Sequence, residues 1–194
     1  MIHHLRRATI ALLFFAPGLA LAHPGHEAST FLEGLAHPIG GLDHLLAMIA
    51  IGILASRFTG SARLALPAAF LVAMALGAWA SSTSLPLVEA MIALSLVAFG
   101  LAIMRTRAVP ASLSIAAVAL FGIFHGHAHG TEASGSILAY SAGFLLSTAL
   151  LHALGLWATV RVQQTSKHAP AALRIAGALV ATTGVVLMTV TRLA

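Results

Sequence analysis

The chain is organised as a series of long apolar runs separated by short polar segments. Most of these runs reach the ~20 residues that an α-helix needs to cross ~30 Å of hydrocarbon at ~1.5 Å per residue. The alternation of apolar and polar residues expected of half-buried strands is not evident. An α-helix forms hydrogen bonds with nearly all of its own backbone N–H and C=O groups, as lipid requires. The pattern predicts an all-α polytopic membrane helix bundle with six transmembrane helices, near residues 37–55, 64–80, 86–104, 110–129, 136–158 and 171–190.

A further apolar run, ahead of these six, has the form of a cleavable signal peptide. Two basic residues, Arg6 and Arg7, precede a short apolar stretch, and a small-x-small cleavage pattern ends at Ala22. Because the stretch is short and polar residues follow at once, we expect cleavage there rather than retention as another span. The chain then divides into a signal peptide, 1–22, and a single six-helix transmembrane domain, 23–194.

Composition narrows the class of protein further. Of the 194 residues, 59% are hydrophobic and 8% charged, with a mean hydropathy of +0.98, which excludes an ordinary water-soluble domain. Cysteine is absent, so disulfides, thiolate metal sites and thiol nucleophiles are excluded. The formal charge of +5 comes from basic residues scattered singly or in pairs, without a basic stripe. We therefore expect the lipid bilayer, and no nucleic acid, as a partner.

Basic residues fall in alternate loops between the predicted spans. Segments 23–36, 81–85 and 130–135 contain no Lys or Arg, and only Arg192, in the tail, breaks the alternation. The positive-inside rule then places the mature N-terminus outside the cytoplasm, in agreement with a translocated signal peptide. We expect a multi-pass protein of the bacterial inner membrane whose cytoplasmic loops carry Arg57, Arg63, Arg105, Arg107, Arg161, Lys167 and Arg174.

The outer end of the first predicted span contains His37, Asp43 and His44. Ionisable groups beside hydrocarbon are costly and usually mark an ion path, and imidazole with carboxylate binds divalent transition metals. A capping carboxylate with a hydrogen-bonded imidazole is the structural alternative. On a regular helix His37 and His44 would lie ~10.5 Å apart along the axis. Gly40 and Gly41 permit a break, so either His37 folds back or it is an outermost ligand above the other two.

The outer end of the fourth predicted span contains a second group of histidines. His125 and His129 are four residues apart and share a helix face, whereas His127 points away. Glu132 follows at the spacing of one further turn, as another ligand or as a group that orients an imidazole. We expect His125 and His129, more than His127, to belong to a metal site. The alternative is a His-rich loop that only concentrates metal.

Three further residues are candidates for the same chemistry. Glu89, near the outer end of the third span, is either a pathway carboxylate or an interfacial residue that reaches water. His23 would collect metal at the mature N-terminus. His152, deeper in the fifth span, is either a buried, hydrogen-bonded residue or an inner relay. The candidate metal site therefore comprises His37, Asp43, His44, His125, His129 and Glu132, with Glu89, His127 and His23 as further members.

The two motifs together resemble those of the HupE/UreJ family of nickel, and sometimes cobalt, permeases. They read His37-x5-Asp43-His44 and Phe124-His125-Gly-x-Ala-His129-Gly-x-Glu132. The resemblance covers nearly the whole chain and implies that the matching residues, with Glu89, take part in metal recognition or passage. It also implies nickel uptake that supplies hydrogenase or urease maturation, with maturation proteins as downstream partners. The residues themselves indicate only a borderline divalent cation, since Ni²⁺, Co²⁺, Zn²⁺ and Cu²⁺ accept these donors.

We expect transport rather than catalysis, without a prosthetic group. A permease must bind an ion firmly enough to remove water and weakly enough to release it, which suits imidazoles with few carboxylates. No GxxxxGK[ST] loop is present, so we expect no ATP hydrolysis by this chain. An intramembrane metal-dependent hydrolase, or a metal-sensing or chaperone membrane subunit, is the alternative interpretation.

Overall fold

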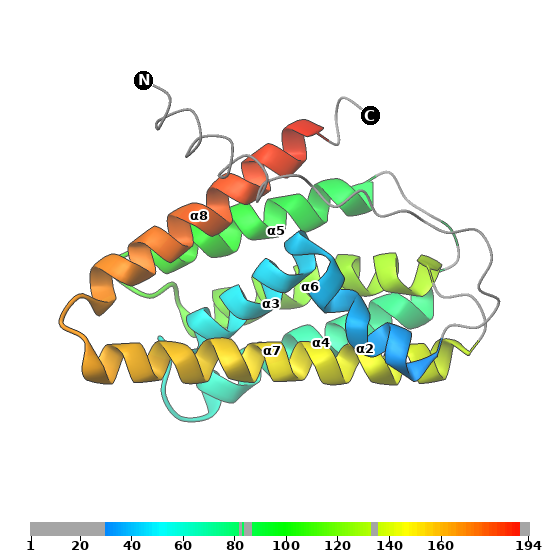
Figure 1. Ribbon diagram of the computed structural model, residues 1–194, viewed down its shortest axis with the longest axis horizontal. Helices are drawn as coiled ribbons and strands as arrows, with labels where there is room; N and C mark the ends of the chain where they lie inside the picture. Colours follow the sequence, from blue (N-terminus) through cyan, green and yellow to red (C-terminus); the bar gives the residue numbers. More distant parts are fainter. Residues whose placement is uncertain (1–29, 82, 84–86, 133–135, 191–194) are drawn as a thin grey trace, which may run out of the picture.

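A computed structural model describes residues 30–81, 83, 87–132 and 136–190. Within that part of the chain every regular element is an α-helix (Figure 1). The predicted signal peptide and His23 lie outside the described residues. In chain order the helices are α2 (Phe31–Gly40), α3 (Leu42–Ala55), α4 (Ser61–Ala80), α5 (Leu87–Met104), α6 (Ala111–Glu132), α7 (Ile137–Thr165) and α8 (Ala169–Val190).

The prediction of an all-helical, multi-pass membrane bundle is confirmed, with one difference in its first span. Helices α4 to α8 are each long and apolar enough to cross a membrane. Helices α2 and α3 pass that test only as a pair, and they are bent by 84° relative to each other. The predicted helix at 37–55 is therefore two helices. With 14 residues, α3 is only ~21 Å long, short of the ~30 Å of a hydrocarbon core.

Local sequence explains where α2 begins and ends. Thr30 and Glu33 form a capping box, in which the Glu33 N–H donates to Thr30 Oγ1 at 3.2 Å and the Thr30 N–H donates to Glu33 Oε2 at 2.7 Å. Gly41 adopts an extended conformation, with φ −98° and ψ 121°, and separates α2 from α3. The chain therefore turns sharply just after His37 and just before Asp43.

Glycines allow α4 and α6 to pack with their backbones in contact. A Cβ atom on Gly77 would collide with the carbonyl oxygen of Ile123, and one on Gly126 would collide with that of Met74. Helices in a membrane have no hydrophobic driving force to associate, so they depend on close van der Waals packing. Small residues at such positions let the two backbones approach closely enough for that packing. Helix α6, which carries the second histidine motif, is thus fixed against α4.

Glycines also allow close backbone contact between α7 and α3, the second helix of the bent α2–α3 pair. Gly52 of α3 faces the carbonyl oxygen of His152, and Gly155 of α7 faces that of Ile49 at 2.5 Å from its ideal Cβ position. Figure 1 shows α2 crossing α7 near one end of the bundle, with α3 further inside and α5 and α8 side by side on the opposite flank. The position of α3 between these helices explains why its break is tolerated, because irregular backbone at membrane depth must be sheltered by protein.

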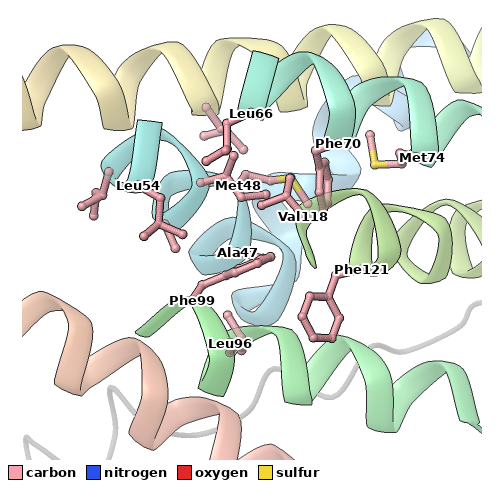
Figure 2. Packing of buried hydrophobic residues seen from close by; sticks show 14 of the residues in the cluster. Ala47, Met48, Leu54, Leu66, Phe70, Met74, Leu96, Phe99, Val118 and Phe121 are labelled. Atoms are coloured by element: carbon pink, nitrogen blue, oxygen red, sulfur yellow. The ribbon is translucent and has the colours of Figure 1, made fainter. Parts of the chain in front are cut away.

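The apolar core surrounds α3. Met48 of α3, Phe70 of α4 and Val118 of α6 are buried and lie in the same part of the cluster (Figure 2). Large apolar side chains such as Trp79 and Leu138, 85% and 80% exposed, lie on the outside of the bundle, where lipid would cover them. Helix α3, which among the described helices is longer only than α2, is therefore the most enclosed one, and the longer helices separate it from lipid.

The two ends of the bundle differ in charge. Arg57, just after α3, donates to the carbonyl oxygens of Ile103 at 2.9 Å and Arg105 at 2.8 Å, which joins two loops at one end. A cleft of about 790 Å³ at this end is also lined by Lys167 and Arg174. The basic loops that the sequence assigns to the cytoplasmic side thus meet at one end, and the break at Gly41 lies towards the other.

The close contact between α4 and α6 yields a stability prediction. Replacing Gly77 with alanine should lower the free energy of unfolding by about 1–3 kcal/mol, because the added methyl group forces two backbones apart. Thermal unfolding of the protein in detergent would measure the change. Gly40→Ala is the control, since nothing lies within 4 Å of its ideal Cβ position. Equal melting temperatures for the two variants would contradict this account of the packing.

Candidate metal centre

Three imidazoles from three helices meet at the end of the bundle opposite the basic cleft. They belong to His37 at the end of α2, His44 in the first turn of α3 and His129 in the last turn of α6, and one ring nitrogen from each lies within 4.8 Å of the other two. The ring centroids are 4.8 Å apart for His37 and His129, and 4.7 Å apart for His44 and His129. Two motifs that are remote in sequence therefore form one cluster.

The break at Gly41 decides between the two positions considered for His37. Its ring centroid lies 5.8 Å from that of His44, much less than the separation expected on a continuous helix. The 84° bend turns the end of α2 back over the start of α3. His37 therefore folds back beside His44. It is not an outermost residue about two helical turns above His44, as it would be on a continuous helix.

The geometry of this cluster fits a transition-metal cation. Imidazole nitrogens bind such ions at ~2.0–2.1 Å, so two nitrogens on one ion lie at most ~4.2 Å apart. Nitrogens within 4.8 Å of one another reach that separation by a small inward movement. Imidazole in its neutral form suits zinc, copper, iron and nickel. Three such ligands leave room for water or a carboxylate on the same ion.

Asp43 orients His44. Its Oδ1 atom lies 3.0 Å from His44 Nδ1 and accepts the main-chain N–H of His44 at 2.8 Å. Because a carboxylate accepts, Nδ1 carries the proton and Nε2 the lone pair, as in the carboxylate–histidine–metal arrangement of metalloproteins. The start of a helix also favours the negative charge of Asp43. Asp43 thus fixes the orientation of the His44 ring, and its own place in the metal site stays a prediction.

His125 and His129 lie on one face of α6, and both are fully buried. His125 Nδ1 donates to the Phe121 carbonyl oxygen at 2.9 Å, which leaves the lone pair on Nε2. Neither that Nε2 atom nor either nitrogen of His129 has a hydrogen-bond partner among the described residues. The ring of His125 lies 5.2 Å from that of His44, so His125 adjoins the three-histidine cluster. Buried lone pairs of this kind are costly unless a ligand binds them.

The remaining predicted residues lie apart from the cluster or beyond the described side chains. His127 Nε2 bonds with the Thr83 carbonyl oxygen at 2.8 Å, on the far side of α6 from the cluster, as its spacing indicates. Glu89 is exposed in the first turn of α5 and is not part of the three-histidine cluster. Glu132 is the last residue of α6, but its side chain, like His23, lies outside what the structure describes. Their roles in metal binding stay predictions.

Sequence reasoning missed the aromatic residues that position the imidazoles. The His129 ring stacks on that of Phe144 at 4.6 Å and 23°, and the Tyr140 ring lies 5.9 Å from that of His37. Phe70 of α4 contacts His125, with ring centroids 5.2 Å apart. Tyr140 and Phe144 share a helix face, but this spacing is equally typical of ordinary core packing. The sequence offered no signal that distinguishes the two.

The basic cleft at the other end is unsuited to the same ion. Its lining includes four cationic side chains and, among the described residues, no carboxylate or imidazole. A dication would be repelled there rather than bound. The chemistry therefore points to the histidine cluster as the cation site.

Comparisons with known proteins confirm the family resemblance seen in the sequence. The family model described as HupE / UreJ protein matches residues 10–187, a range that includes both histidine motifs. Protein HupE of Rhizobium leguminosarum bv. viciae is 38% identical over 177 residues, which cover 89% of this chain and 91% of that protein. No solved structure matches the chain.

The cluster leads to a binding prediction for the purified protein in detergent. His129→Ala should weaken Co²⁺ binding by at least about tenfold, the loss typical even of residues that only support a ligand. Titration followed by visible absorption or calorimetry would measure the affinity. His168→Ala is the matched control, because His168 is exposed in the turn before α8, at the basic end. Equal affinities in the two variants would remove His129 from the site.

Proposed function

The chain belongs to the HupE/UreJ family, and on that premise we propose that it is a membrane permease for a divalent transition-metal cation, Ni²⁺ in the first place and also Co²⁺. The convergence of His37, His44 and His129 at one end of the bundle carries this proposal. A membrane protein of this class needs a cation site enclosed by helices near one end of the bundle, and in the cluster His44 and His129 are buried while His37 is partly exposed.

The ligand set suits passage better than storage. Imidazoles without thiolates bind nickel and cobalt, yet release them more readily than cysteine sulfur would. Asp43 contributes a negative charge next to His44 at 3.0 Å, which partly balances the charge of an arriving dication. The site therefore attracts the ion and still allows it to leave.

The proposed direction of transport is inward. In the orientation that the basic loops favour, the histidine cluster faces the extracytoplasmic side of the bacterial inner membrane. The membrane potential is worth ~2.3 kcal/mol per charge per 100 mV, so it favours inward movement of a dication by ~4.6 kcal/mol. We further propose that the imported metal supplies hydrogenase or urease maturation, with the maturation proteins as downstream partners.

Accumulation of radioactive nickel in cells or energised proteoliposomes tests this function. His44→Ala should abolish most uptake because it removes a ligand. Asp43→Asn should reduce uptake about 10–100-fold, since asparagine still accepts a hydrogen bond from His44 but lacks the charge. His168→Ala should behave as the wild type.

Accumulation by the wild type no greater than in protein-free vesicles would contradict the permease, and equal uptake above that background in all four proteins would remove His44 and Asp43 from the pathway. Stoichiometric binding without any accumulation by the wild type would instead indicate a metal sensor or chaperone. Metal-dependent turnover of a lipid or peptide substrate would indicate an intramembrane hydrolase.

A further inference from the structure

A second group of buried polar atoms lies deeper in the bundle, on α7. His152 is 2% exposed, and its Nδ1 donates to the Met48 carbonyl oxygen at 2.8 Å. Because a carbonyl oxygen only accepts, the lone pair of the ring is on Nε2, which has no hydrogen-bond partner in the described part of the chain. Thr148, one turn earlier on the same helix, is fully buried, and its Oγ1 likewise lacks a partner among the described residues.

The hydroxyl of Thr148 differs in this respect from that of a second buried threonine on α7. Thr159 Oγ1 donates to the Gly155 carbonyl oxygen of its own helix at 2.7 Å. This back-bond is the usual way in which a helix satisfies a buried threonine. Buried polar groups nearly always have partners, and those that lack one in a native protein often serve a ligand. Thr148 Oγ1 and His152 Nε2 are therefore two buried polar atoms, one helical turn apart on α7, that have no hydrogen-bond partner among the described residues.

This pair is connected to the metal centre by two contacts. Met48, which fixes the ring of His152, lies one turn after His44 on α3. The Phe70 ring lies 5.2 Å from that of His125 and 5.4 Å from that of His152, so one aromatic side chain contacts both imidazoles. A line of imidazoles thus runs from the three-histidine cluster through His125 to His152.

We propose that His152 and Thr148 form an inner cation-binding station, which receives a partly dehydrated divalent transition-metal ion from the outer cluster through His125, past the edge of Phe70. This inference rests on the proposed permease function and adds a second binding site to it. The station offers one imidazole nitrogen and one hydroxyl oxygen, with no carboxylate among the described residues at that depth. It therefore binds the ion more weakly than the outer cluster, which favours onward movement.

Two variants remove the inner ligands with little change of shape. Asparagine at position 152 places its amide N–H near the former Nδ1 position, so His152→Asn retains a donor to Met48 and removes Nε2. Thr148→Val replaces the hydroxyl with a methyl group. Thr159→Val is the matched control, because it makes the same replacement at a buried threonine on the same helix whose hydroxyl is already satisfied.

The measurements are the initial rate of nickel uptake, the affinity for the first Co²⁺ ion in detergent and the melting temperature. His152→Asn and Thr148→Val should each lower uptake at least about tenfold, with first-ion affinity within about twofold of the wild type. Thr159→Val should retain wild-type uptake. Thr148→Val should melt no lower than the wild type, since it removes a buried hydroxyl that lacks a partner.

Wild-type uptake in both His152→Asn and Thr148→Val would overturn the inner station. So would a loss of uptake that is matched by Thr159→Val, or by an equal loss of first-ion affinity or of folded protein, because each indicates a purely structural role. If His152→Asn fails to fold, Thr148→Val still decides the matter. The wild type separates the two proposals: if it accumulates no more nickel than protein-free vesicles do, the permease itself fails. If the wild type accumulates nickel and both inner variants match it, the inner station alone fails.

Discussion

The sheltered break between α2 and α3 is the constraint on which the site depends. An interrupted helix in lipid exposes backbone groups that nothing satisfies, so the break must be enclosed by other helices. Backbone contact with α7 supplies that enclosure: a Cβ atom on Gly34 would collide with the Tyr140 carbonyl oxygen, and one on Gly143 with that of Phe31. With α2 held in this way, the 84° bend directs His37 back towards His44. A straight helix would keep the two imidazoles on separate turns.

The imidazoles are oriented by different means, and the difference bears on what each can bind. His44, His125 and His152 each use Nδ1 in a bond to an oxygen acceptor, which fixes the ring and directs the chemistry to Nε2. His129 is instead positioned by stacking on Phe144, a contact that uses neither ring nitrogen. Aromatic packing can hold a ring without consuming its lone pair. His129 thus keeps both ring nitrogens without a hydrogen-bond partner among the described residues.

The sequence predicted the helical class, the alternation of basic loops and the pairing of His125 with His129, because each follows from hydropathy, charge or the 3.6-residue period alone. It also predicted that His127 points away from its neighbours. It left the position of His37 open, since the direction of a chain after a glycine depends on what packs against it. Phe144 was not foreseen for the same reason: periodicity defines the faces of a helix, whereas contact between remote backbones decides which faces meet.

The charge at the two ends of the bundle has a further consequence for transport in the proposed orientation. At the basic end, Arg57 is bonded to backbone carbonyl oxygens, while Arg105, Lys167 and Arg174 line the cleft. A positive surface lowers the local concentration of dications within a Debye length of ~8–10 Å. It does not set the direction of net flow, which depends on the membrane potential and on the activity of the ion on each side. In the proposed orientation it would reduce rebinding from the cytoplasm, so that the proposed inner station would be filled mainly from the outer cluster.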